Sequence, residues 1–128
     1  MSDISSKRVL ILEDDEVLLF CLDSLVRDLG FDSLGFKNVK EAQEAITEHE
    51  FYAAILDNSV PASKSGPVLT GEGLRYGRQL RETHPQIKIA LHTLDSYDKY
   101  GIEYLQSLGI AYIGKMEMDQ IKDFLREE

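Results

Sequence analysis

Residues 9–19 read VLILEDDEVLL, and in this segment four apolar side chains are followed at once by four acidic ones. An unbroken apolar run is typical of a strand that is buried on both faces of a parallel sheet. Adjacent carboxylates repel one another, so this acidic run needs a compensating partner where the strand ends. The segment therefore predicts a buried strand at residues 8–12 that delivers carboxylates to one edge of a sheet.

The rest of the chain alternates short apolar runs with segments of helical period. Asn38 is predicted to cap the second helix and Asp95 or Ser96 the fourth, whereas residues 58–70 are predicted to form a polar loop that contains Pro and Gly. Such alternation predicts an α/β fold in which helices cover both faces of a parallel sheet. The predicted strands are residues 8–12, 31–36, 51–56, 87–92 and 110–114, and the predicted helices are residues 17–29, 39–49, 72–83, 96–108 and 119–128.

Composition excludes several classes of protein. The formal charge of −9, from 14 basic and 23 acidic residues, argues against a nucleic-acid binder. Cys21 is the only cysteine, which excludes an intramolecular disulfide, and its place on the first helix predicts a core position. No signal peptide or membrane span is expected, because no apolar run approaches the ~20 residues that cross a bilayer. We expect one cytoplasmic domain over residues 1–128, with its core at about residues 7–127.

Chemically active side chains follow four of the five predicted strands. Because ligands of open parallel sheets bind at the carboxyl ends of the strands, these side chains are expected to converge. Clustered carboxylates favour Mg²⁺ or Mn²⁺ together with a phosphate, and a carboxylate is itself able to accept a phosphoryl group. A lysine and a hydroxyl would then compensate charge on the phosphoryl oxygens. The residues at these strand ends are Glu13, Asp14, Asp15, Asp57, Thr93 and Lys115.

On these residues the whole chain resembles the response-regulator receiver domain of two-component signalling. LILEDDE is similar to the acid pair of the family, and ILDNSVP is similar to its phosphoacceptor strand, with Asp57 as acceptor and Pro61 after it. Thr93 and Lys115 match the hydroxyl and lysine of the family, and Tyr112 matches its aromatic switch position. The resemblance implies a CheY-like, flavodoxin-like doubly wound (βα)₅ fold with strand order 2-1-3-4-5.

The resemblance also implies a metal site, but its register leaves two alternatives. The acid pair is either Glu13 and Asp14, which the usual pattern of the family favours, or Asp14 and Asp15. The first alternative leaves Asp15 and Glu16 in the first turn of a helix, where the helix dipole favours acids. The other implied ligands of Mg²⁺ are Asp57 and the backbone carbonyl of Ser59.

Several positions are expected to tune the reaction or depart from the pattern. The family implies that Ser59 and Asp95 tune the lifetime of the phosphoryl group. Leu94 is bulkier than usual and is expected to slow phosphorylation by small donors such as acetyl phosphate. Met116 stands where the family has Pro, which predicts a trans turn of different shape. The long segment 58–72 is a lid, a partner contact or a tolerated insertion.

The implied function is that of a stand-alone receiver without an output domain. Asp57 would take a phosphoryl group from a histidine kinase or phosphotransfer protein in a Mg²⁺-dependent phosphorelay. The downstream target is expected to be a protein that binds the face formed by the fourth helix, fifth strand and fifth helix. Such a domain is not an enzyme in the ordinary sense, since it catalyses only its own phosphoryl transfer and hydrolysis.

Two other classes compete with this interpretation. A phosphorylation-independent adaptor would keep the fold without the chemistry, and Leu94 and Met116 mildly favour it. A phosphatase resembling haloacid dehalogenases needs Asp-x-Asp, whereas Ser59 occupies the position of the second acid. Tyr97, Tyr100 and Tyr104 recur with helical spacing and belong either to a partner surface or to ordinary packing.

Overall fold

The computed structural model describes residues 7–115 and 117–127. Five of its strands form one parallel sheet with the order β2-β1-β3-β6-β7, which is the predicted order 2-1-3-4-5 when these strands are counted along the chain. The flavodoxin-like α/β prediction is thus confirmed. The strands are β1 (Arg8–Leu12), β2 (Asp32–Phe36), β3 (Ala53–Leu56), β6 (Lys88–Thr93) and β7 (Ile110–Gly114).

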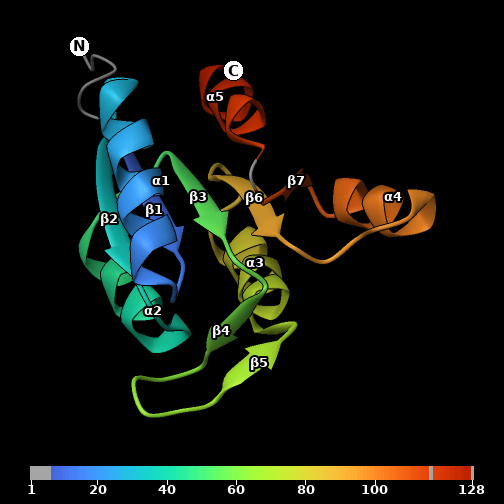
Figure 1. Ribbon diagram of the computed structural model, residues 1–128, viewed down its shortest axis with the longest axis horizontal. Coiled ribbons are helices and arrows are strands. Elements are labelled where there is room, and N and C mark those ends of the chain that lie inside the picture. The colour runs from blue at the N-terminus through green and yellow to red at the C-terminus, as the bar shows by residue number, and fades with distance from the viewer. Residues whose placement is uncertain (1–6, 116, 128) are drawn as a thin grey trace.

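The described residues form five helices, which cover both faces of this sheet (Figure 1). One buried apolar cluster joins the sheet to α1 and α5, and a second cluster joins its other face to α2, α3 and α4. The central strands β1 and β3 are apolar throughout their buried length because both of their faces are covered. The helices are α1 (Glu16–Asp28), α2 (Val39–Glu48), α3 (Glu72–Thr83), α4 (Lys99–Ser107) and α5 (Met118–Arg126).

Local capping explains where the first two helices begin. The Asp15 carboxylate accepts hydrogen bonds from the N–H groups of Val17 and Leu18, so Asp15 is the N-cap of α1. Asn38 caps α2, as predicted, by accepting from the N–H of Glu41. These caps fix the two chain segments that leave the carboxyl ends of β1 and β2.

The predicted cap of the fourth helix is wrong. The helix α4 begins at Lys99, and Asp98 is its N-cap, with its side chain accepting from the N–H of Gly101. Asp95 lies outside the helix because its carboxylate and its backbone groups bind other parts of the molecule. The segment after β6 is therefore longer than the sequence suggested.

The prediction of a loop at residues 58–70 is corrected by two short strands within this segment. This segment contains an antiparallel hairpin of β4 (Ser59–Pro61) and β5 (Val68–Thr70), which extends past the carboxyl ends of the sheet strands (Figure 1). Val60 is fully buried in the core, and the N–H of Lys40 donates to the carbonyl of Ala62 at 2.9 Å. These two anchors hold the hairpin against α2 and give the polar segment a regular structure.

Cys21 is exposed, which corrects its predicted core position. The buried stripe of α1 passes through Leu22 and Val26, so Cys21, which precedes Leu22, lies on the solvent side of the helix. In the part of the chain that the structure describes, no helix combines the length and apolar character that a membrane crossing requires.

Candidate functional site

Three carboxylates meet at the carboxyl end of the sheet. Ligand oxygens of Glu13, Asp14 and Asp57 all lie within 4.8 Å of one another. Glu13 and Asp57 are almost completely buried, with 1% and 4% of their surfaces exposed. Asp15 does not join the cluster because its side chain caps α1. Of the two registers that the sequence left open, the structure places the pair Glu13 and Asp14 beside Asp57.

Lys115 partly compensates the charge of this cluster from the end of β7. Its Nζ lies 3.2 Å from Oδ2 of Asp57 and 3.3 Å from Oε1 of Glu13. The N–H of Lys115 donates to the carbonyl of Thr93 at 3.0 Å, so the lysine is held in register with β6. The predicted residues from three separate strands thus converge on one buried cluster.

The donor set fits a hard divalent cation such as Mg²⁺. Carboxylate oxygens are the ligands that Mg²⁺ prefers, and among the described residues the buried Oε1 of Glu13 has the Lys115 ammonium, at 3.3 Å, as its only cationic neighbour. Lys115 provides one positive charge for the side chains of three acids. A buried oxygen of this kind, facing other carboxylates, is stabilised by a cation that binds between them.

Burial dominates the electrostatics of Glu13. Removal from water raises the pKa of Glu13 to about 7, and the Asp57 carboxylate contributes to the rise, whereas Lys115 opposes both effects. Burial alone would lower the pKa of Lys115, but the neighbouring Asp57 and Glu13 carboxylates outweigh burial, and the pKa is raised. Lys115 therefore keeps its charge, and the raised pKa of Glu13 favours its protonated form as pH falls below neutrality.

We predict that Mg²⁺ stabilises the protein more at pH 8 than at pH 5.5. The folded-state pKa of Glu13 lies above its ordinary value of 4.5, so its contribution to stability is present below 4.5 and is lost as pH rises through about 7. A bound cation compensates the charge that appears in this window. Melting temperatures with and without Mg²⁺ at the two pH values check this, and an equal increment at both would contradict it.

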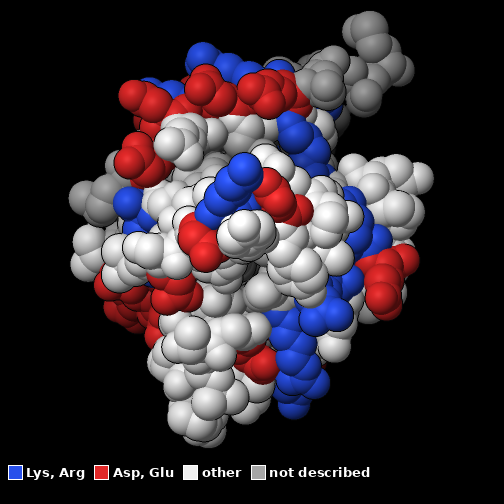
Figure 2. All heavy atoms as spheres, turned by 90° about the vertical axis from the view of Figure 1, so that its right-hand side faces the viewer, with Lys and Arg blue, Asp and Glu red and all other residues white. Residues whose placement is uncertain are grey.

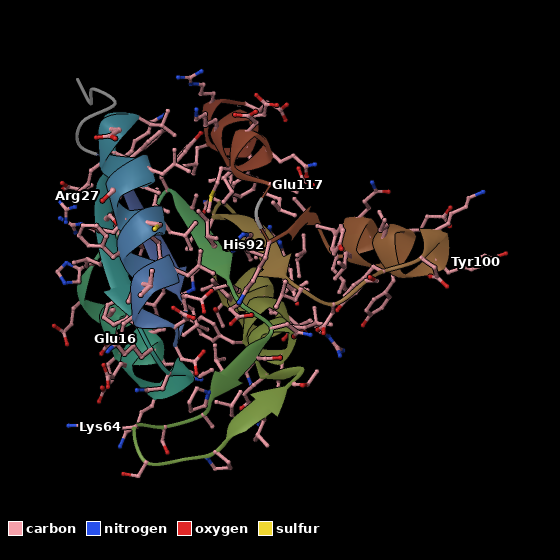
Figure 3. The ribbon with its side chains drawn as sticks, viewed as in Figure 1. Glu16, Arg27, Lys64, His92, Tyr100 and Glu117 are labelled. Atoms are coloured by element: carbon pink, nitrogen blue, oxygen red, sulfur yellow. The ribbon has the colours of Figure 1, made fainter. Side chains whose placement is uncertain are left out.

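The same comparison avoids interference from His92, a fully buried residue near the end of β6 (Figure 3). Burial lowers the pKa of His92 to about 4, and neither ring nitrogen has a hydrogen-bond partner within the described part of the chain. Its contribution to stability is present above its ordinary pKa of 6.5 and is lost as pH falls toward 4. As pH falls, the protein thus loses the stability contribution of His92 while it gains that of Glu13. The pH dependence of the melting temperature mixes these two effects, whereas the increase in melting temperature on adding Mg²⁺ isolates the carboxylate cluster.

Asp57 is positioned by backbone contacts on both sides. Its N–H donates to the carbonyl of Leu12 at 2.8 Å, and its Oδ1 accepts from the N–H of Ser59 at 3.3 Å. The start of α3 lies directly against its carbonyl, because a Cβ built on Gly73 would be 1.8 Å from that oxygen. In the sequence, Gly73 and Leu74 match the Gly–Leu start of this helix in receiver domains, but that match does not reveal how close Gly73 comes to Asp57.

The predicted hydroxyl and aromatic residues meet at Asp95. Oγ1 of buried Thr93 accepts from the N–H of Asp95 at 3.1 Å, and the hydroxyl of Tyr112 donates to the carbonyl of Asp95 at 3.0 Å. The ring of Tyr112 is half-buried and lies against Tyr97, with ring centres 5.2 Å apart. Leu94 is 77% exposed, so its side chain lies mostly in solvent. Met116 lies outside the described residues.

Asn58 also belongs to this arrangement, although the sequence analysis missed it. Its Nδ2 donates to Oδ2 of Asp95 at 2.9 Å, and its Oδ1 accepts from the N–H of Leu74 at 3.0 Å. Asn58 follows Asp57 directly and is buried, so it connects the acceptor strand with α3 and with the segment after β6. A buried amide with partners in two distant segments leaves no periodic signal in a sequence.

A hollow of about 440 Å³ lies beside Asp14. The hairpin contributes to its wall, and Lys64 lies at the turn between β4 and β5 (Figure 3). Its lining combines acidic and basic side chains from three different segments of the chain. The residues that line it are Asp14, Lys37, Asn38, Glu41, Pro61 and Lys64.

Comparison with known families identifies the class of protein. The family described as the response regulator receiver domain matches residues 9–126, and the chain belongs to this family. The resemblance inferred from the sequence is therefore confirmed. A search among curated proteins found no match to the sequence.

Solved structures of low sequence identity share the fold. The response regulator TrrA from Thermotoga maritima, in complex with Mg²⁺ and beryllofluoride, is 22% identical with a TM-score of 0.73, over 91% of this chain and 94% of that one. A CheY-like receiver domain protein from Methanospirillum hungatei is 21% identical with a TM-score of 0.75, over 94% of each chain. A response regulator from Burkholderia pseudomallei, with a phosphorylated aspartic acid and a calcium ion, is 19% identical with a TM-score of 0.76, over 94% of this chain and 67% of that one.

Proposed function

We propose that this receiver domain accepts a phosphoryl group on Asp57 from a histidine kinase or phosphotransfer protein, in a reaction that depends on Mg²⁺. The observation that carries the proposal is the convergence of Glu13, Asp14 and Asp57 with Lys115 at one buried edge of the sheet. The metal in the TrrA structure and the phosphorylated aspartic acid in the Burkholderia structure support it by analogy.

Each side chain has a role that follows from its position. Glu13, Asp14, Asp57 and the backbone carbonyl of Ser59 would hold Mg²⁺, which would withdraw charge from the phosphoryl oxygens. An oxygen of Asp57 forms the new bond to phosphorus, and the bond from phosphorus to the donor nitrogen breaks with its electron pair left on that nitrogen. Lys115, already 3.2 Å from Asp57, compensates the charge on the transferred group.

Thr93 is prepared to donate a hydrogen bond to that group. Its Oγ1 already accepts the N–H of Asp95, which leaves the hydroxyl proton available for a phosphoryl oxygen. Tyr112 binds the carbonyl of the same Asp95, so a change at Thr93 reaches the aromatic ring through one residue. We propose that phosphorylation acts through this contact on the face formed by α4, β7 and α5.

This face offers a surface for a downstream protein. Tyr100 is 77% exposed at α4 (Figure 3), and Tyr104, on the same helix, is 45% exposed. On the α4 side, uncharged areas surround a few charged side chains at the centre, and further charged side chains gather along the upper rim, at lower left and down the right side (Figure 2). Exposed aromatic groups in such surroundings are typical of protein contacts. Around the acceptor, we propose Ser59, Leu94 and Asp95 as the positions that tune the reaction.

Binding of beryllofluoride, a phosphoryl analogue, tests the proposal. With Mg²⁺ present, beryllofluoride is expected to raise the melting temperature and change tyrosine fluorescence of the natural protein but not of Asp57→Asn. The matched variant Asp119→Asn removes an exposed carboxylate of α5 and is expected to respond like the natural protein. Absence of any Asp57-dependent response would favour the phosphorylation-independent adaptor, and rapid turnover of phosphate esters would favour a hydrolase.

A further inference from the structure

We propose that Asn58 is a positioning residue that couples the phosphoacceptor strand to Thr93 and Tyr112 through the side chain of Asp95. This inference rests on the proposed phosphorylation of Asp57 and assigns a role to the residue that follows it. The role is to hold the segment after β6 in the arrangement that prepares Thr93 and keeps the Tyr112 ring packed.

Asp95 is the point at which three separate contacts meet. Its carboxylate accepts from Nδ2 of Asn58 at 2.9 Å, its N–H donates to Thr93, and its carbonyl accepts from Tyr112. The two backbone contacts set the Thr93 hydroxyl and the Tyr112 ring, while the carboxylate is the group by which another element holds the residue. Asn58 binds that carboxylate, so loss of its amide also leaves the backbone of Asp95 free to move.

The chemistry of Asn58 leaves no freedom in how its amide is oriented. Its Oδ1 accepts from the N–H of Leu74 at the start of α3, and its Nδ2 faces the carboxylate. The reverse orientation would set an amide oxygen against the carboxylate and N–H groups against the N–H of Leu74. An aspartate keeps the first contact and loses the second, whereas an apolar residue loses both. The position therefore requires one donor and one acceptor on a short side chain.

The hydrogen bond from Asn58 to Asp95 is strong enough to affect ligand binding at Asp57. Hydrogen bonds to a charged group are stronger than those between neutral groups, and the Asn58 side chain is almost fully buried, so water does not replace a lost partner there. Loss of this bond is expected to weaken ligand binding at Asp57 about ten-fold, which corresponds to roughly 1.4 kcal/mol. The effect reaches the ligand through Thr93, whose hydroxyl is held by Asp95.

Exchange of donor and acceptor across the pair gives the sharpest test. Asn58→Asp keeps the contact to Leu74 but sets two carboxylates against each other. Adding Asp95→Asn restores a donor and an acceptor with their places exchanged, whereas adding Asp95→Ala only removes the repulsion. Both double variants carry the same formal charge, so the difference between them reports the hydrogen bond. The readout is the affinity for beryllofluoride at saturating Mg²⁺, together with the amide NMR signal of residue 95.

We expect Asn58→Asp alone to weaken beryllofluoride binding about ten-fold. Adding Asp95→Asn to it is expected to recover most of that loss, and adding Asp95→Ala is expected to recover less. Equal recovery in the two double variants, or unchanged affinity in Asn58→Asp, would overturn the inference. If Asn58→Asp does not fold, Asp95→Ala in the natural background must weaken binding in the same direction. If the natural protein itself does not bind, the proposed function fails first, and the inference falls with it.

Discussion

Replacing Gly73 with alanine is expected to destabilise the fold by more than about 4 kcal/mol, the range reserved for mutations with a specific steric cause. The new Cβ would lie 1.8 Å from the carbonyl oxygen of Asp57, 2.7 Å from its carbonyl carbon and 2.8 Å from Cα of Asn58. All three atoms belong to the backbone at the end of β3, so no side-chain rotation relieves the overlap. Urea unfolding of the variant measures the loss.

Gly77→Ala is the matched control for this prediction. Gly77 lies one turn further along α3 and is also buried, but its added Cβ would meet a Leu56 methyl group at 3.2 Å. A side-chain methyl group is able to shift, and alanine favours a helix more than glycine does. We expect a change within about 1 kcal/mol. Equal stability of the Gly73 and Gly77 variants would refute the close approach of α3 to Asp57.

Lys115→Met is expected to destabilise the metal-free protein by about 2–4 kcal/mol at pH 8, because two buried carboxylates lose their shared cation. The loss is expected to shrink at pH 5.5. Without Lys115, the pKa of Glu13 rises further above its already raised value, so the protonated form prevails there. Mg²⁺ is expected to restore part of the stability at pH 8 by binding the same carboxylates. Chemical unfolding at both pH values provides the measurement.

Lys122→Met serves as the control for charge removal. Lys122 lies on α5 and makes an ion pair of 3.7 Å with the exposed carboxylate of Asp119. Exposed pairs contribute little, so its loss is expected to change the free energy of unfolding by less than about 1 kcal/mol at either pH. A pH-independent effect of Lys115→Met, no larger than that of Lys122→Met, would contradict the role given to the buried pair.

The five main strands and the convergence of side chains at their ends were predictable, because period and position carry that information. Apolar runs such as residues 9–12 mark buried parallel strands, and the topology then brings Asp57 and Lys115 to one edge. The position of Glu13 and Asp14 follows from a local competition that the sequence left open. In the structure Asp15 caps α1, while Glu13 and Asp14 lie beside Asp57, an arrangement that favours the first of the two acid pairs.

The features that the sequence did not predict share one physical cause, which is their dependence on contacts between distant segments. The hairpin β4–β5 depends on the burial of Val60 and on a bond from α2 to Ala62, and neither interaction is local. The late start of α4 follows from tertiary hydrogen bonds of Asp95 with Asn58 and Tyr112, which override the local preference of Asp95 for a helix cap. The contact of Gly73 with Asp57 and the role of Asn58 were not predicted, because both arise only when segments distant in the chain come together.

The decisive measurement is the intact mass of the protein after incubation with acetyl phosphate and Mg²⁺, followed until it no longer changes. We predict the addition of one phosphoryl group per chain in the natural protein, none when the metal is removed by a chelator, and none in Asp57→Asn. Unchanged mass of the natural protein, or an equal mass increase in Asp57→Asn, would contradict the assignment of Asp57 as the phosphoacceptor.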